Sequence, residues 1–293
     1  MKIIFSRKGF DSGYGGIPSP IFPDGTMLSM PIPSKEDHIG YNQLVVPNIS
    51  KTYWQVLREL LENKKLREGE KLKIPLDKRK NYPCHFDPDL RKESLSGREK
   101  GWLPSLGQIG SAQGHLRKQG IQRDDLFLFF GWYQFIEFRN GELCYKKDVK
   151  YVDGFHIFFG YLEIGKILDH QAIKTHTPSW LKYHPHFRLP RRRKDESNTI
   201  YVSTRKLSWN TKNTNIPGGG MFKFHKDLIL TRENHNRTEW NLDPQIFKNL
   251  KITYHPDPWE NGGFKSARKG QEFVVHSDKK AIEWAKKLIT NHH

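Results

Sequence analysis

Two apolar, aromatic-rich stretches with a turn signal between them constrain the fold of this chain more than any other feature. Residues 125–132 read DLFLFFGW, and residues 155–165 read FHIFFGYLEIG. Short continuous apolar runs of this kind are typical of strands that are buried on both faces. The pair Asn140 and Gly141 favours a hairpin turn, so the pattern predicts antiparallel pairing of the two strands. A glycine at the matching place in both runs indicates a bend or a close backbone contact.

The remaining elements alternate irregularly, which argues against a doubly wound parallel sheet. Apolar faces at helical spacing predict helices from Ser50 to about Lys64, over about 111–119, and after Ser277. We therefore predict an α+β fold with a mixed, largely antiparallel sheet, packed helices and long irregular loops. The whole chain, 1–293, is expected to form a single domain. Further strands are expected at residues 2–5, 199–203, 227–230 and 270–275.

Composition limits the cellular compartments and the classes of protein that this chain fits. Hydrophobic residues make up only 35% of the chain, but aromatics reach 13% and supply a core that aliphatic residues do not. The longest apolar runs are too short to cross a bilayer, and no apolar signal region follows the basic start. The only cysteines are Cys84 and Cys144, which give no disulfide framework. The expectation is a cytoplasmic protein without membrane contact.

The formal net charge of +17 is the strongest global indication of a partner. A surplus of this size attracts polyanions, so it favours a nucleic acid or a nucleotide. The alternative is that the charge serves solubility alone. The charge is clustered, and residues 188–198, which contain one of these clusters, are expected to form a mobile, solvent-facing basic loop that contacts phosphates or serves only as a linker. The clusters are residues 64–80, the group Lys146, Lys147 and Lys150, and residues 191–194.

Residues 82–91, YPCHFDPDLR, hold the densest cluster of reactive groups in the chain. His85, Asp87 and Asp89 recur at every second position, and alternate side chains of an extended segment share one face. A mixture of imidazole nitrogen and carboxylate oxygen suits a divalent metal such as iron, zinc, manganese or magnesium. The alternative is a loop in which the aspartates hold turns beside Pro83 and Pro88.

Other histidines and amides extend this possible site. The small residues around Gly110 permit close approach of a ligand, and Gln108, Gln113 and His115 place polar groups beside them. This helix is either a pocket wall or a tight packing device. His184 and His186 are one residue apart and could share a strand face as metal ligands, or they could be loop residues.

A polar, glycine-rich loop, SRKGFDSGYGG at 6–16, follows the first expected strand. Its amides and its two cations suit a phosphate or another anion. The candidate phosphate-binding residues there are Arg7, Lys8, Gly15 and Gly16. No Gly-Lys-Ser/Thr ends the loop, so hydrolysis of a nucleoside triphosphate is not indicated. A plain surface turn is the alternative.

Several segments together resemble the third class of nucleotide-modification-associated domains, which occurs in bacterial and phage systems that modify DNA bases. The resemblance implies a role in nucleotide or DNA chemistry, but it supplies neither a settled reaction nor a set of catalytic residues. The segments that carry it are spread over most of the chain. They are residues 6–12, 15–25, 85–90, 107–116, 125–132 and 270–274.

Three functional hypotheses follow. The first is an enzyme that acts on or near nucleic acid with a metal-assisted step. Two histidines and one carboxylate would also suit a ferrous oxygenase. The second is a non-catalytic nucleic-acid-binding module, for example a DNA-binding one, that positions modifying enzymes, and the third is an iron-dependent oxygenase of a peptide or small metabolite. For the first hypothesis, the candidate residues are sorted by role. They are Asp11, Asp87 and Gln113 for catalysis, Arg7, Lys8, Gly15, Gly16 and Arg91 for phosphate, His85, Asp87, Asp89 and His115 for metal, and Trp102 and Trp132 for base stacking.

Overall fold

A computed structural model of the chain describes residues 1–63, 82–148, 150–209, 215–260, 262–268 and 270–293. The basic segment 64–80 that the sequence singles out lies outside the described residues. Within the described residues, no helix is both long enough and apolar enough to cross a membrane.

A nine-stranded sheet forms the centre of the molecule, with the strand order β15-β1-β7-β9-β10-β6. Three further strands pair outside this path: β11 with β9, and both β2 and β8 with β7. Only the pairs β1–β7 and β2–β7 are parallel, so the sheet is mixed and mostly antiparallel. The strands are β1 (Ile3–Arg7), β2 (Ser19–Ile21), β6 (Ser105–Gln108), β7 (Leu126–Arg139), β8 (Glu142–Tyr145), β9 (Phe155–Leu168), β10 (Thr199–Ser203), β11 (Gly219–Met221) and β15 (Glu272–Val275).

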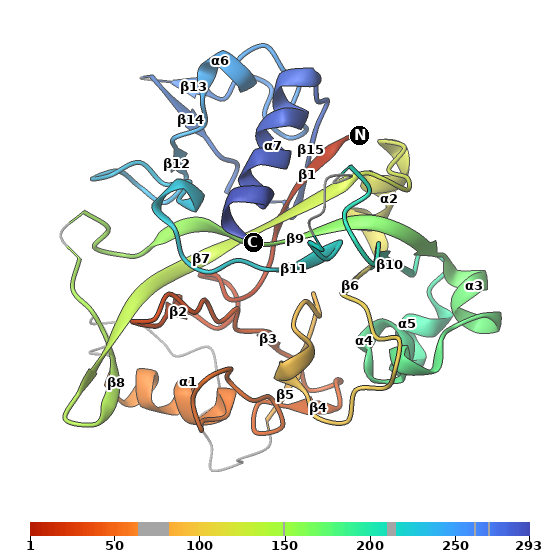
Figure 1. Cartoon of the computed structure of the whole chain (residues 1–293), viewed down its shortest axis with the longest axis horizontal. Helices are drawn as coiled ribbons and strands as arrows, with labels where there is room; N and C mark the ends of the chain where they lie inside the picture. The colour runs from red at the N-terminus through yellow and green to blue at the C-terminus, as the bar shows by residue number, and fades with distance from the viewer. Residues whose placement is uncertain (64–81, 149, 210–214, 261, 269) are drawn as a thin grey trace.

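Two small sheets flank the large one. The first has the order β3-β5-β4, with β3 (Ile32–Pro33), β5 (Pro83–His85) and β4 (Ile39–Gly40). The second has the order β12-β14-β13, with β12 (Glu239–Trp240), β14 (Gly263–Lys265) and β13 (Trp259–Glu260). Figure 1 shows the long strands β7 and β9 crossing the middle of the molecule, with the β12–β14 sheet on one side and the β3–β5 sheet on the other.

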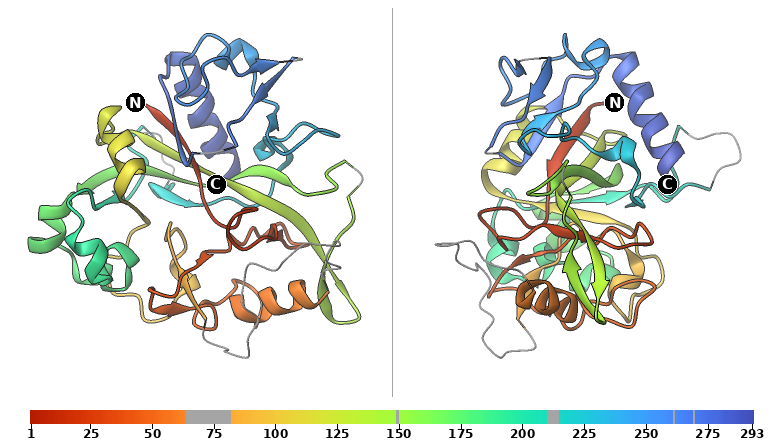
Figure 2. Two further views of the ribbon diagram at one scale, coloured as in Figure 1. Left: turned by 180° about the vertical axis from the view of Figure 1, so that it is seen from behind. Right: turned by 90° about the vertical axis from the view of Figure 1, so that its left-hand side faces the viewer.

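Helices cover this arrangement on three sides. Helix α7 lies beside the β12–β14 sheet, α1 lies beside the β3–β5 sheet, and α3, α4 and α5 gather at one end (Figures 1 and 2). The described helices are α1 (Tyr53–Glu62), α2 (Gly110–Lys118), α3 (His170–Thr175), α4 (Pro185–Arg188), α5 (Pro190–Lys194), α6 (Pro244–Phe247) and α7 (Lys279–His292). Short 3-10 turns occupy Lys92–Ser94, Ser179–Tyr183 and Lys226–Leu228.

The predicted α+β class and the antiparallel pairing of the two aromatic stretches are confirmed. Leu126 of β7 lies opposite Glu163 of β9, and the pairing continues to Tyr133 opposite Phe155. The buried aromatic side chains of these strands form much of the main core. The turn at Asn140 was assigned to the wrong strand pair, because it joins β7 to the short strand β8 and not to β9.

Other local predictions needed correction. The helix predicted from Ser50 begins at Tyr53, because Thr52 provides the capping hydroxyl and forms a capping box with Gln55. Residues 227–230 were predicted as a strand, but the first two belong to the 3-10 turn Lys226–Leu228 and the other two follow that turn. The basic stretch predicted as a loop contains α5, whose five residues are all outside the core.

The two end strands of the path β15-β1-β7-β9-β10-β6 are connected by a side-chain contact. Gln108, the last residue of β6, donates its side-chain amide to the carboxylate of Glu272, the first residue of β15. Helix α2 follows β6 directly, and His115 on it reaches Thr253, beside β15, with a distance of 3.0 Å between Nε2 and Oγ1. The curved sheet thus brings segments from both ends of the chain to the wall of one cavity.

Candidate functional site

The site begins where the short strand β5 ends. His85 is the last residue of β5 and pairs with Ile32 of β3, so its backbone is fixed by the small sheet. Asp87 follows two residues later, and the backbone amide of Gly107 in β6 donates to its Oδ1 at 2.9 Å. The small sheet and the edge of the large sheet therefore position the first two groups together.

Helix α4 supplies the third group, His186. Its Nε2 lies 3.8 Å from Asp87 Oδ2, and His85 Nε2 lies 3.6 Å from the same oxygen. Donor atoms of the three residues all lie within 4.8 Å of one another. The side chains are 14%, 4% and 4% exposed for His85, Asp87 and His186. Two imidazoles and one carboxylate at this spacing could hold a divalent metal, and we call them the His85 triad.

Neighbouring side chains orient both imidazoles with Nε2 toward Asp87. The buried Asn198 donates to the carbonyl of His186 and accepts from Nδ1 of that ring at 2.8 Å. On the other side, His85 Nδ1 lies 3.0 Å from the guanidinium of Arg192, which can only donate, and 3.2 Å from the carboxylate of Asp37, to which Arg192 also donates. Metal-binding histidines characteristically donate their second ring nitrogen to such a partner.

The charges of the triad suit a cation. Burial alone raises the pKa of Asp87, but the imidazoles of His184, His85 and His186 outweigh burial and hold its pKa well below the usual range. Burial holds the pKa of His186 well below its usual value, against the charge of Asp87. Burial also lowers the pKa of His85, yet the hydrogen bonds to Asp37 and Asp87 outweigh it, and the net shift is upward. Metal ligation requires an ionised carboxylate and neutral imidazoles, which these shifts favour at Asp87 and His186, whereas a bound metal would have to displace the proton that the raised pKa favours on His85.

A further imidazole, His184, lies on the far side of Asp87. Its Nε2 is 3.4 Å from Asp87 Oδ1, and its Nδ1 accepts from the backbone amide of His186. This Nε2 is buried and has no hydrogen-bond partner among the described residues. His184 is therefore available either to hold Asp87 in place or to approach a cation bound by the triad.

The absence of a side chain at Gly107 makes room for the triad. A Cβ built on Gly107 would lie 2.2 Å from Cδ2 of the His186 ring. The same residue donates its amide to Asp87, so β6 contacts two of the three members of the triad at one position. Gly107 lies in one of the segments that carry the family resemblance.

Two of the predicted metal ligands do not join the triad. Asp89 accepts hydrogen bonds from Arg98 and Trp102, and a backbone bridge ties it to Ser105. The alternation predicted from His85 to Asp89 does not hold, because the strand itself ends at His85. His115 lies in the wall of the same cavity, but its imidazole contacts Thr253 and the ring of Tyr254 rather than the triad.

The triad opens into a cavity of about 670 Å³, which we call the His85 cavity. Arg7, Lys8, Arg192 and Arg268 bring positive charge to its wall. Its rim also carries Tyr14 and Tyr254, which are 58% and 55% exposed. Exposed aromatic rings beside cations are the combination that binds a base and a phosphate together. The volume lies within the range of small-molecule sites.

The glycine-rich loop does not form the predicted anion cradle with free amides. The backbone amides of Gly13 and Tyr14 both donate to Oδ1 of Asp11 at 2.6 Å, so the chain's own carboxylate occupies them. Gly15 and Gly16 adopt positive φ angles and shape the turn, but they do not line the cavity. Arg7 and Lys8 do line it, together with Asp11.

The remaining predicted residues lie elsewhere. Gln113 is buried and accepts a hydrogen bond from Tyr201 at 2.9 Å, so it faces the sheet rather than the cavity. Arg91 is outside the cavity wall, and its Nη1 is buried in the protein. Trp102 packs under Arg98, with the guanidinium 5.1 Å from the ring centroid.

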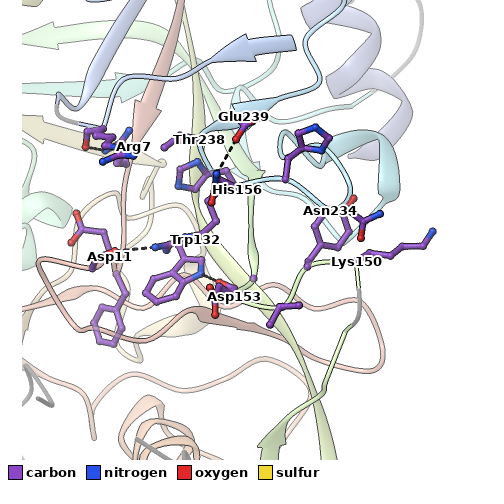
Figure 3. Close-up of a pocket in the computed structure, with 18 of the residues that line it drawn as sticks. Arg7, Asp11, Trp132, Lys150, Asp153, His156, Asn234, Thr238 and Glu239 are labelled. Carbon is purple, nitrogen blue, oxygen red and sulfur yellow. Dashed lines mark hydrogen bonds between the residues drawn. The ribbon is translucent and has the colours of Figure 1, made fainter. Parts of the chain in front are cut away.

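A second cavity of about 910 Å³ adjoins the first and contains Trp132, so we call it the Trp132 cavity. Both cavities are lined by Arg7, Asp11 and Arg268. Figure 3 shows Arg7 and Asp11 on one side of the Trp132 cavity, and Lys150 and Asn234 on the other. The guanidinium of Arg237 lies 3.9 Å from the centroid of the Trp132 ring, so one face of that ring is already covered.

Several residues that complete the site have no local signal in the sequence. Asp37, Asn198 and Glu272 reach it from segments far apart in the chain, and none of them belongs to a metal-binding spacing. His186 had a signal in its spacing from His184, but only the fold shows that it faces His85.

Comparison with known proteins identifies a family for this chain but no individual relative. No curated protein and no solved structure matches the chain. A family profile described as nucleotide modification associated domain 3 matches residues 2–276, which include every member of the triad and both cavities. Because the match covers most of the 293 residues, the chain belongs to the nucleotide modification associated domain 3 family, as its resemblance to that class predicted.

Proposed function

We propose that this protein is an enzyme that modifies a nucleotide in a metal-assisted step. The observation that carries the proposal is the His85 triad, which lies in the wall of a cavity with a cationic, aromatic rim. Such a donor set suits iron, manganese or zinc and leaves coordination positions free for water, dioxygen or substrate. The metal would supply Lewis-acid or redox chemistry there, and membership of the family supports a nucleotide as the substrate.

The chain's own residues would hold the substrate beside that metal. Tyr14 and Tyr254 are exposed at the rim and offer ring faces to a base. Arg7 is fixed in place by the backbone carbonyls of Ala267 and Arg268, to which it donates at 2.6 and 2.8 Å. A guanidinium held in this way is preorganised for a phosphate. Arg268 is exposed and lies in both cavities, so it can follow a phosphate backbone.

We further propose that the nucleotide belongs to a nucleic acid strand. The Trp132 cavity adjoins the His85 cavity and adds Lys150 and Arg237 to the shared cations. The net charge of +17 supports the same partner. In this arrangement one nucleotide enters the His85 cavity, and a neighbouring nucleotide lies in the Trp132 cavity.

The decisive experiment compares the wild-type protein with the Asp87→Ala variant after anaerobic purification. Elemental analysis should find a divalent metal in the wild type and little in the variant. Nucleic acid from cells that express each protein is then digested, and the nucleosides are analysed by mass spectrometry. We expect a modified nucleoside only with the wild type. Metal-free wild-type protein that produces the same nucleosides as Asp87→Ala would contradict the proposal and favour a non-catalytic binding module.

Replacing Arg268 by glutamine should weaken binding of single-stranded oligonucleotides of all sequences by a similar factor. The plot of log affinity against log salt concentration should become less steep, by the amount that corresponds to the loss of about one phosphate contact. Fluorescence anisotropy over a range of salt concentrations measures both quantities. Arg139→Gln is the matched control, because Arg139 is 62% exposed at the end of β7 and lines neither cavity. An equal effect of both substitutions would indicate only the general charge of the protein.

A further inference from the structure

Glu272 is a buried carboxylate in the wall of the His85 cavity, and the proposed metal site does not use it. Its side chain is 1% exposed at the start of β15. Oε1 accepts from Lys8 Nζ at 2.6 Å and also from the side-chain amide of Gln108. The other oxygen, Oε2, is buried and has no hydrogen-bond partner among the described residues.

Two consecutive residues connect Glu272 to the triad. Gly107 donates its backbone amide to Asp87, and Gln108 donates its side-chain amide to Glu272. Asp87 and Glu272 both line the His85 cavity, so β6 contacts two carboxylates of one cavity wall. A substrate that fills this cavity therefore lies against both the triad and Glu272.

The pairing of Glu272 defines what its second oxygen can bind. Lys8 balances the charge of the carboxylate, and Lys8 and Gln108 both donate to Oε1. A carboxylate oxygen accepts hydrogen bonds and cannot donate when ionised. A buried acceptor without a partner is costly, so a ligand with an N–H group gains affinity here, and a ligand with a carbonyl oxygen loses it.

We propose that Oε2 of Glu272 accepts a hydrogen bond from the amino group of the substrate base. Resting on the proposed function, this makes cytosine, adenine or guanine the substrate class, in preference to thymine or uracil. The N3–H of thymine and uracil is flanked by two carbonyl oxygens, which a carboxylate repels. Glutamate and aspartate characteristically accept from the amino group of cytosine in nucleic-acid recognition, and enzymes that extrude a base read its edge in this way.

The test measures how the full-length protein, as purified, binds short oligonucleotides with one base. Each probe has ten residues, in deoxyribose or ribose form, with a single central base and abasic residues elsewhere. Fluorescence anisotropy should show that the best amino-bearing base binds at least about tenfold tighter than thymine or uracil. Replacing cytosine by N4,N4-dimethylcytosine should remove its advantage, whereas 5-methylcytosine, which keeps the amino group, should not.

The Glu272→Gln variant should reverse the preference. Lys8 and Gln108 are donors, so the amide oxygen of glutamine would face them and its NH₂ would take the place of Oε2. This group donates, so binding of amino-bearing bases should fall at least about tenfold, and binding of thymine should not fall. Glu283→Gln, at an exposed position of α7, is the matched control.

The outcomes of this test distinguish a failure of the role of Glu272 from a failure of the proposed function on which it rests. Equal affinity for all central bases in the wild type, or an unchanged preference in a folded Glu272→Gln variant, would overturn the role of Glu272 and leave the metal site standing. If that variant does not fold, equal affinity of the wild type for cytosine and dimethylcytosine overturns the role. Failure of every probe to bind would overturn both proposals.

Discussion

Replacing His186 by alanine should lower the affinity for a divalent metal by roughly a hundredfold or more. Even the loss of an outer partner of a metal ligand costs about 10–100-fold, and His186 is itself one of the three donors. The substitution also leaves Asp87 without one of the imidazoles that stabilise its charge. Production of the modified nucleoside should disappear with the metal.

Anaerobic titration with iron(II), manganese(II) and zinc(II), followed by calorimetry, measures this loss. His176→Ala is the matched control, because His176 is an exposed histidine at the end of α3 and joins no possible metal-binding cluster of the described residues. Thermal unfolding in the presence of a chelator establishes that the His186→Ala variant is folded. A folded variant that binds each metal as tightly as the wild type would exclude the His85 triad as the metal site.

Gly107→Ala is expected to disturb the same site by adding a single methyl group. The new Cβ would lie 2.2 Å from the His186 ring, and β6 is held on its other side by β10. Overpacking of a buried position typically costs about 1–3 kcal/mol of stability. The ring must move away from Asp87, so metal affinity should fall by about tenfold or more.

Gly114→Ala provides a control that should raise the stability of the protein instead of lowering it. Gly114 lies inside α2, and a Cβ there would meet no atom within 4 Å. Exchange of glycine for alanine inside a helix stabilises it by about 1 kcal/mol, so this variant should unfold at a higher temperature. Paired thermal unfolding and metal titration of both variants measure the contrast. Wild-type metal affinity in Gly107→Ala would show that the His186 ring is not held against β6.

The parts of the fold that follow from local patterns could be predicted from the sequence. The aromatic runs that became β7 and β9 bury consecutive side chains on both faces of the sheet, and the amphipathic segment of α7 buries one face of the helix. Boundaries such as the start of α1 were less predictable, because the capping residue is decided by one hydrogen bond. The turn at Asn140 shows a related limit, since a hairpin signal does not identify which later strand pairs with the strand before the turn.

The site was predictable only in part, for a similar reason. His85 and Asp87 lie within one short segment, and their chemistry is visible in its spacing. Asp89 fits the same spacing, but it pairs with Arg98 in the folded chain. Asn198 and Glu272 acquire their roles through hydrogen bonds to residues 12 and 164 positions away, and no local pattern encodes such a pairing.

The pairing of β15 with β1 has a consequence for the order in which the protein can be completed during synthesis. Ile3 lies opposite Val275, so β1 gains this neighbour only after all the residues between the two strands have been synthesised. Long-range pairing of this kind slows folding. Glu272 arrives with the same strand, so a nascent chain that stops before β15 has the residues of the triad but lacks one wall of its cavity. The proposed substrate site therefore stays incomplete during synthesis until β15 has been made.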